Sequence, residues 1–157
     1  MEVTVRRAVY EDIPFLKLFQ KKLVDSERPF DPTIPREGEI EYYSLKELLE
    51  SKEVNFLVVE VEKKVVGCGF GEIRKNVEWG RSKRIGYIGL MFVEEEFRGN
   101  KIGKMLVDRL CEWFKERKVG DIRLKVLKKN IRAIKLYEKA GFEEFIIEMR
   151  RADPIFL

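Results

Sequence analysis

The chain has 157 residues, of which 45% are hydrophobic and 38% charged, with a formal net charge of +4. This balance excludes a disordered chain and is typical of a single globular domain, residues 1–157. The absence of histidine excludes Ser-His-Asp and Cys-His catalysis and any metal site that uses histidine. No apolar run approaches the roughly 18 residues of a membrane span, and no signal-peptide pattern opens the chain. We therefore expect a cytoplasmic protein without a membrane partner.

The small basic excess comes from 32 Lys and Arg residues set against 28 Asp and Glu residues. These charges are scattered, which favours a solvated surface over a nucleic-acid interface. Abundant Lys and Glu with a single Gln resemble thermophile usage. The two cysteines, Cys68 and Cys111, lie far apart in no metal-ligand spacing, so we interpret both as buried thiols and expect no metal site.

Taken in chain order, hydrophobic periodicity and breaker residues predict six strands and four helices. Strands are expected at residues 3–8, 54–61, 64–73, 85–93, 122–127 and 142–150. Helices are expected at residues 13–26, 44–50, 102–119 and 131–140, with a proline-rich loop at 27–39. The strand–helix–strand unit at 85–127 should be a right-handed parallel crossover, so the class is α/β, with a mixed, largely antiparallel sheet and helices on both faces.

Four positions carry helix-end signals. Asp12 is a candidate N-cap for the first helix, and Ser44 with Glu47 forms a possible capping box for the second. Asn130 is predicted to cap the last helix and Gly141 to stop it.

The turn after the strand ending at Val93 is the first candidate site. Gly99 and Gly103 would let the backbone approach a ligand. The free amides and positive dipole end of the following helix suit an anion such as a pyrophosphate. Arg98, Lys101 and Lys104 would add positive charge; the alternative is a plain turn with solvated basic residues.

A second candidate site lies on the last helix. Asn130 and Tyr137 are seven residues apart and therefore share one helix face. Taken alone, Tyr137 is better explained as a packing residue than as a catalytic one, because an aromatic at this spacing more often belongs to the core.

Together the two segments resemble the GNAT superfamily of N-acetyltransferases. The superfamily pattern Asn-x-x-Ala-x-x-Leu-Tyr-x-x-x-Gly-Phe is matched at every fixed position by residues 130–142. The pattern Arg/Gln-x-x-Gly-x-Gly/Ala is matched at Arg98 and Gly103, with Lys101 in place of the middle glycine. The resemblance implies a GNAT-like fold with a splayed parallel pair of strands in the middle of the sheet, and acetyl-CoA as cofactor.

The resemblance also implies residue roles. The main chain of Met91 and Val93 would bind the pantetheine arm, and the Met91 amide would polarise the thioester carbonyl. Asn130 would bind near the sulfur, and Tyr137 would donate a proton to the departing thiolate. The full set of expected cofactor contacts is Met91, Phe92, Val93, Arg98, Gly99, Asn100, Lys101, Ile102, Gly103, Lys104, Asn130 and Tyr137.

The resemblance implies direct acetyl transfer to a primary amine of a small molecule or peptide, and it leaves the base open. Two positions where some members carry a catalytic Glu hold Tyr87 and Lys125 here. Glu72 is the nearest remaining carboxylate that could face the acceptor cleft, although its position at a strand end favours a solvated residue over a base. The loop at residues 25–43 is expected to contact the acceptor.

Two further hypotheses remain at this point. A catalytically silent acyl-CoA-binding or sensor module is the alternative to an enzyme, motivated by Lys101 and by the missing family base. The apolar C-terminal residues 155–157 suggest a homodimer completed across the last strand's edge.

Overall fold

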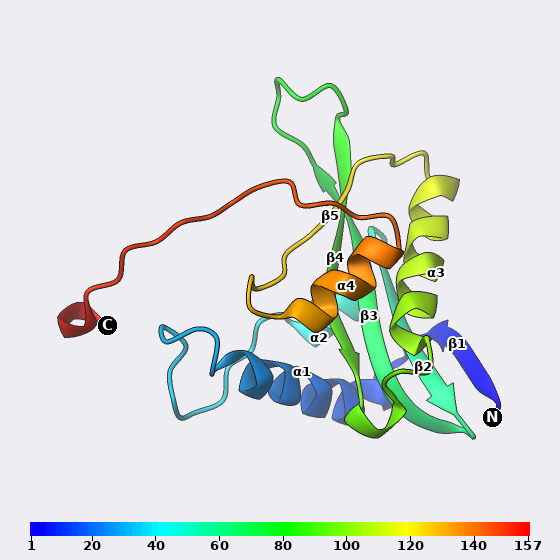
Figure 1. Ribbon diagram of the computed structural model, residues 1–157. Helices are drawn as coiled ribbons and strands as arrows, with labels where there is room; N and C mark the ends of the chain where they lie inside the picture. Colours follow the sequence, from blue (N-terminus) through cyan, green and yellow to red (C-terminus); the bar gives the residue numbers. More distant parts are fainter.

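A single sheet of five strands organises the chain, for which the computed structural model describes all of residues 1–157 (Figure 1). The strands follow each other in space as they do in sequence: β1 (Val3–Arg7), β2 (Val54–Val61), β3 (Lys64–Lys75), β4 (Arg84–Val93) and β5 (Ile122–Leu124). The first four are antiparallel, and β5 pairs with β4 in parallel. The predicted mixed, largely antiparallel sheet is therefore confirmed.

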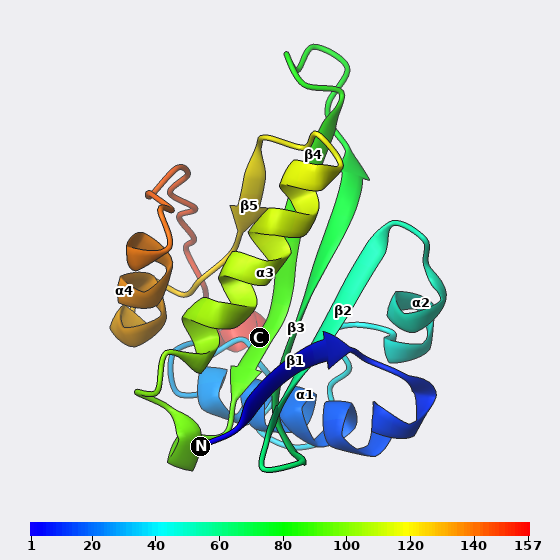
Figure 2. The ribbon, with the colours of Figure 1, turned by 90° about the vertical axis from the view of Figure 1, so that its right-hand side faces the viewer.

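Helices cover both faces of this sheet. α1 (Ile13–Glu27) and α2 (Leu45–Glu50) enclose one core, which includes Phe19, Phe70 and Phe92. α3 (Ile102–Glu116) encloses the other, and α4 (Ile131–Lys139) packs beside it. Figure 2 shows α3 lying along the sheet with α4 at its side. No helix is long and apolar enough to cross a membrane.

The predicted signals at Asn130 and Gly141 are confirmed, and Ser44 caps α2 as predicted but without the reciprocal Glu47 side-chain bond of a capping box. The side chain of Ser44 accepts from the Glu47 amide at 3.4 Å, and that of Asn130 accepts from the Ala133 amide at 3.2 Å. Gly141 has a φ of +93°, the left-handed conformation that ends a helix.

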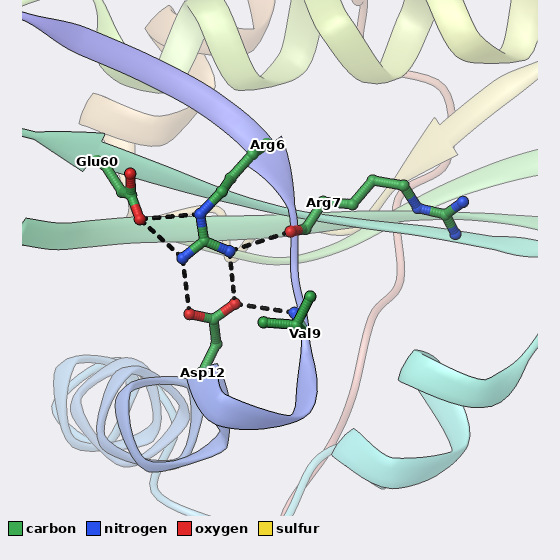
Figure 3. A network of polar contacts seen from close by, with 5 residues as sticks. All are labelled: Arg6, Arg7, Val9, Asp12 and Glu60. Carbon is green, nitrogen blue, oxygen red and sulfur yellow. Dashed lines mark hydrogen bonds and ion pairs between the residues drawn. The ribbon is translucent and has the colours of Figure 1, made fainter. Parts of the chain in front are cut away.

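The prediction for Asp12 is wrong: its side chain does not cap α1. The Asp12 carboxylate instead accepts from the Val9 amide at 2.8 Å and pairs in a bidentate manner with Arg6, at 2.8 and 2.9 Å. Arg6 also reaches Glu60 on β2, so the network joins β1, β2 and the start of α1 (Figure 3). A bidentate, charge-assisted pair with an arginine is stronger than a hydrogen bond from a neutral helix amide, which explains why the Asp12 carboxylate binds Arg6 and does not cap α1.

Two strand predictions fail at the end of the chain. β5 stops at Leu124 and not at 127, and residues 142–150 form no strand at all. Alternation reports a local preference, whereas a strand also needs a neighbouring edge. Here the segment leaves the body of the protein, and Arg150 bonds Asp31 at 2.8 Å. The parallel pair β4–β5 therefore lies at the edge of the sheet and not in its middle.

Candidate active site

The parallel strands β4 and β5 separate after only three paired residues. Pairing joins residues 86–88 of β4 to Ile122–Leu124, and from Gly89 onward β4 has no strand on this side. A β-bulge lies at the same point. Phe70 faces Gly89 and Cys68 faces Phe92, so Leu90 and Met91 together oppose one residue of β3. Leu90 takes a φ of +48°, which places the distortion at that residue.

We call the unpaired side of β4 beyond residue 88 the gap. The alternation of main-chain groups along β4 decides which of them face it. The Glu94 amide donates to Val66 of β3 at 2.8 Å. Main-chain groups alternate in direction along a strand, so those of Phe92 also face β3, whereas those of Met91 and Val93 face the gap. The Phe92 ring stacks on Phe19, with 5.1 Å between ring centroids, inside the core. The structure thus brings Met91 and Val93 to the gap and leaves Phe92 out of it.

The first turn of α3 follows directly and has no side-chain cap. The amides of Ile102, Gly103 and Lys104 have no partner within the helix and carry its positive dipole end. Gly99 has a φ of +83°, and a Cβ there would meet nothing within 4 Å, so the space over the turn is open. Lys101, the N-cap, takes the left-handed conformation with a φ of +63°. This geometry suits a phosphate-bearing ligand.

The polar side chains around this turn mostly hold it together. Arg98 Nε donates to the Val93 carbonyl at 2.8 Å, and Asn100 Nδ2 donates to the Phe97 carbonyl at 3.2 Å. Lys104 Nζ lies 2.6 Å from Asp108 Oδ2. Neither Arg98 nor Lys101 forms an ion pair, and the Lys101 side chain makes no hydrogen bond either, so its ammonium is free to meet an anion.

Gly103 has a different role from the expected ligand approach. A Cβ at this position would lie 2.6 Å from Leu136 Cδ1 on α4. The missing side chain therefore lets α4 pack closely against α3. This contact also fixes the position of Tyr137, the next residue after Leu136.

α4 carries both predicted polar residues, Asn130 as its N-cap and Tyr137 near its C-terminal end. Asn130 uses Oδ1 for its cap, which leaves Nδ2 available to a ligand. Tyr137 is partly buried and its ring lies edge-on to Phe142, 6.1 Å away. Burial, with smaller contributions from the nearby Tyr87 and Glu27, raises the pKa of Tyr137 to about 12. The phenol thus stays protonated over the physiological range.

Glu27, at the last position of α1, is the residue that sequence reasoning missed. Its Oε2 accepts from the Tyr42 hydroxyl at 2.8 Å. Burial raises the pKa of this carboxyl, and Asp31 adds to the shift, although the Tyr42 hydrogen bond opposes it. Only the general acidity of the loop at residues 25–43 pointed to it, because nothing local distinguishes Glu27 from its acidic neighbours.

A second tyrosine, Tyr43, lies near the Glu27 carboxylate. The Tyr43 and Tyr87 hydroxyls lie 3.3 Å apart. Glu72, the carboxylate expected here, forms an ion pair with Arg74, whose guanidinium lies 3.8 Å from the centroid of the Tyr87 ring. The Glu72 carboxylate is thus already neutralised by a cation, and that of Glu27 is not.

The match to known proteins agrees with this geometry. The model of the acetyltransferase (GNAT) family matches residues 20–142. An uncharacterised N-acetyltransferase of Methanocaldococcus jannaschii is 32% identical over 145 residues, which cover 90% of this chain and 61% of that protein. An N-alpha-acetyltransferase of Sulfurisphaera tokodaii is 33% identical over 112 residues, covering 66% of this chain and 65% of that one.

Solved structures share the fold. A predicted acetyltransferase of Clostridium acetobutylicum, crystallised with acetyl-CoA, superposes with a TM-score of 0.74 at 22% identity, covering 95% of this chain and 96% of that one. A variant of a Bacillus halodurans protein superposes with a TM-score of 0.86 at 18% identity, covering 95% of this chain and 98% of that one. The family match shows that the chain belongs to the acetyltransferase (GNAT) family, and these solved structures share its fold. The chain spans about three fifths of the length of its Methanocaldococcus relative.

Proposed function

We propose that the protein transfers an acetyl group from acetyl-CoA to the primary amine of a small molecule or peptide. The observation that carries this proposal is the uncapped first turn of α3 beside the unpaired stretch of β4. An anion site next to free main-chain groups fits a ligand that joins a pyrophosphate to an amide-bearing arm. The Clostridium structure crystallised with acetyl-CoA supports the same choice of donor.

The chain's own groups would divide the binding between them. The main chain of Met91 and the amide of Val93, whose carbonyl already accepts from Arg98, would bind the pantetheine amides, and the Met91 N–H would donate to the acetyl carbonyl oxygen. The amides of Ile102 and Lys104 and the ammonium of Lys101 hold the pyrophosphate. When bound, acetyl-CoA supplies an acetyl group already activated as a thioester.

Tyr137 serves as the proton donor to sulfur. Its pKa of about 12 lies well above the roughly 8.5 of a thiol, so full transfer to a free thiolate is uphill by roughly 5 kcal/mol. The phenol therefore acts first as a hydrogen-bond donor and shifts its proton only while the C–S bond breaks. The Tyr regains a proton from solvent after release.

Glu27 serves the acceptor amine. An ammonium is attracted to its carboxylate, and the raised pKa makes Glu27 a stronger base than a surface carboxylate. An α-amine, with a pKa of roughly 7.7–8.0, needs this help less than a lysine amine near 10.4. Relatives with the name N-alpha-acetyltransferase make peptide α-amines the first acceptors to try.

The first experiment is isothermal titration of the purified protein with acetyl-CoA, desulfo-CoA and ATP. We expect micromolar, one-to-one binding of both CoA compounds and none of ATP. If no CoA compound binds, the proposed donor is wrong. Binding without transfer to any peptide, polyamine or aminoglycoside amine would support a silent acyl-CoA module instead.

The acceptor side is tested with Glu27→Gln once a substrate amine is found. We expect kcat to fall by about 10²–10⁴-fold, with acetyl-CoA affinity unchanged and with partial recovery at high pH, where the amine deprotonates in solution. Glu72→Gln is the matched control and should change kcat little, because Arg74 already holds that carboxylate. Full activity in the Glu27→Gln variant would show that Glu27 is not the base that accepts the amine proton.

A further inference from the structure

The hairpin that joins β3 to β4 carries an exposed tryptophan on its tip. Trp79 is 87% exposed, and Val77 near it is 48% exposed. Figure 1 shows this hairpin projecting from the body of the protein, in green at the top. A tryptophan gains more than most side chains from burial, so its position on a projecting tip indicates contact with another molecule.

Hydrogen bonds within the tip hold it in one shape. The Asn76 amide donates to the Lys83 carbonyl at 2.9 Å, and Asn76 Nδ2 donates to the Ser82 carbonyl at 2.8 Å. Lys83 Nζ donates to the Glu78 carbonyl at 3.1 Å. The closed turn fixes the backbone around Trp79 before any partner arrives, which lowers the entropy cost of binding.

Basic side chains gather around this tip and at the end of α3. The hairpin has four exposed basic residues: Lys75, Arg81, Lys83 and Arg84. The Arg84 guanidinium donates to the Arg117 carbonyl at 2.8 Å, which joins the base of the hairpin to the end of α3. Three more exposed basic residues lie there: Lys115, Arg117 and Lys118. None of the seven forms an ion pair. We name residues 75–84 and 115–118 together the basic edge.

The basic edge holds the whole positive excess of the protein. It contains seven basic residues and two acidic ones, Glu78 and Glu116, an excess of five, whereas the full chain has an excess of four. The rest of the chain is therefore slightly acidic. The basic residues are scattered in the sequence, which favoured a solvated surface, but the fold brings the two segments together at the Arg84–Arg117 contact. A patch of this sign attracts a polyanion.

An aromatic platform among cations fits a single-stranded nucleic acid. A base stacks on an exposed indole, while Lys and Arg side chains hold the neighbouring phosphates. A second flat group lies at the end of α3, where the Arg117 guanidinium is 4.6 Å from the centroid of the Trp113 ring. An anionic membrane fits less well. Figure 2 shows the hairpin tip extending beyond the end of α3, so a flat surface that meets the tip end-on leaves residues 115–118 behind.

We propose that the basic edge binds single-stranded nucleic acid, with a base stacked on Trp79 and the phosphates running along the hairpin toward the end of α3. The basic edge lies at the C-terminal end of this 15-residue helix. The turn assigned to acetyl-CoA lies at the other end, a helix length of about 22 Å away. Nucleic-acid binding is therefore independent of the proposed acetyl transfer.

The test is fluorescence anisotropy of labelled single strands of about 12 nucleotides, titrated with the full chain between about 50 and 200 mM salt. RNA and DNA strands of the same sequence are titrated separately, and the tighter one identifies the class of strand. We expect a Kd on the order of 10 μM at physiological salt. Trp79→Ala should weaken binding about 5- to 150-fold through the lost stack. Arg81→Gln/Lys83→Gln should reduce the slope of log Kd against log salt by about 1.4, because two phosphate contacts are lost.

Two control variants make the matched changes elsewhere on the surface. Phe156→Ala removes an aromatic ring that is 84% exposed. Lys46→Gln/Lys52→Gln removes two exposed lysines that form no ion pair. Both should bind the strand as the wild type does. All four variants should keep the wild-type circular dichroism spectrum, because each change lies at an exposed side chain.

Three outcomes overturn the proposal. Unchanged anisotropy with both strands at low salt means that the basic edge binds no nucleic acid. Equal affinity in Trp79→Ala and the wild type, or an equal loss in a control variant, means that the strand binds by charge alone or at another surface. Cosedimentation with phosphatidylglycerol vesicles in place of strand binding assigns the hairpin tip to a membrane surface.

Discussion

The Arg6–Asp12 network gives the sharpest test of the fold, because one carboxylate accepts three hydrogen bonds from two residues (Figure 3). Asp12 is 4% exposed, accepts two bonds from Arg6 and accepts one from the Val9 amide. Asp12→Ala leaves these donors without partners. Breaking a buried ion pair costs about 3–5 kcal/mol.

The expected loss is smaller here, because the Arg6 side chain is 34% exposed and Glu60 remains bound to it at 2.7 Å. We expect Asp12→Ala to lower the free energy of unfolding by about 2–3 kcal/mol, or the Tm by roughly 4–12 °C. The assay is urea unfolding at pH 7. Asp108→Ala, which breaks the exposed Lys104–Asp108 pair, is the matched control and should cost less than about 0.5 kcal/mol.

The stabilisation that the Arg6–Asp12 network provides should decrease at acidic pH. The Arg6 hydrogen bonds, with help from the Val9 amide, hold the pKa of Asp12 below its usual range against the effect of burial. A lowered folded-state pKa means that the stabilisation is present above about pH 4, near the unfolded pKa. It is lost as the pH falls through the folded pKa. The stability gap between wild type and Asp12→Asn should therefore close on acidification. A gap that stays constant, or an Asp12→Ala cost no larger than that of Asp108→Ala, would refute this account.

Two further predictions concern the active site. Tyr137→Phe should lower kcat by about 10²–10⁴-fold with acetyl-CoA affinity nearly intact; equal turnover in steady-state assays would leave Tyr137 only a packing role. Lys101→Gly should raise the free energy of unfolding by up to about 1 kcal/mol by relieving a left-handed side chain, and it should weaken acetyl-CoA binding about two- to fivefold through the lost charge. Lys118→Gly relieves the same conformation, at a φ of +59°, and should match the stability gain without changing titrated affinity.

Much of this structure follows from local sequence signals. The first four strands, all four helices and the caps at Ser44 and Asn130 were predictable, since periodicity and capping depend on neighbours within a few residues. The turn before α3 was predictable for the same reason, because a strand, a glycine and a helix start follow one another directly.

The remainder depends on contacts between distant residues. Asp12 has a good capping sequence, but Arg6 on β1 takes its carboxylate. Glu27 becomes a candidate base only because the folded chain buries it beside Tyr42 and places it near Tyr137. Residues 142–150 have a strand pattern but form no strand in the folded chain, which no local signal can report.

The bulge in β4 explains how one stretch of strand can both fill the core and leave main-chain groups unpaired at the gap. Side chains alternate along a strand, so one extra residue reverses the facing of every residue beyond it. Leu90 absorbs that extra residue at a φ of +48° and stays buried, so that Met91 and Val93 turn their main chain to the gap while Phe92 keeps its ring in the α1 core. Without the bulge, Phe92 would present its main chain to the gap and Met91 would bond β3. The irregular backbone at Leu90 therefore lets the end of β4 keep its apolar side chains in the core and leave main-chain donors and acceptors without a strand partner.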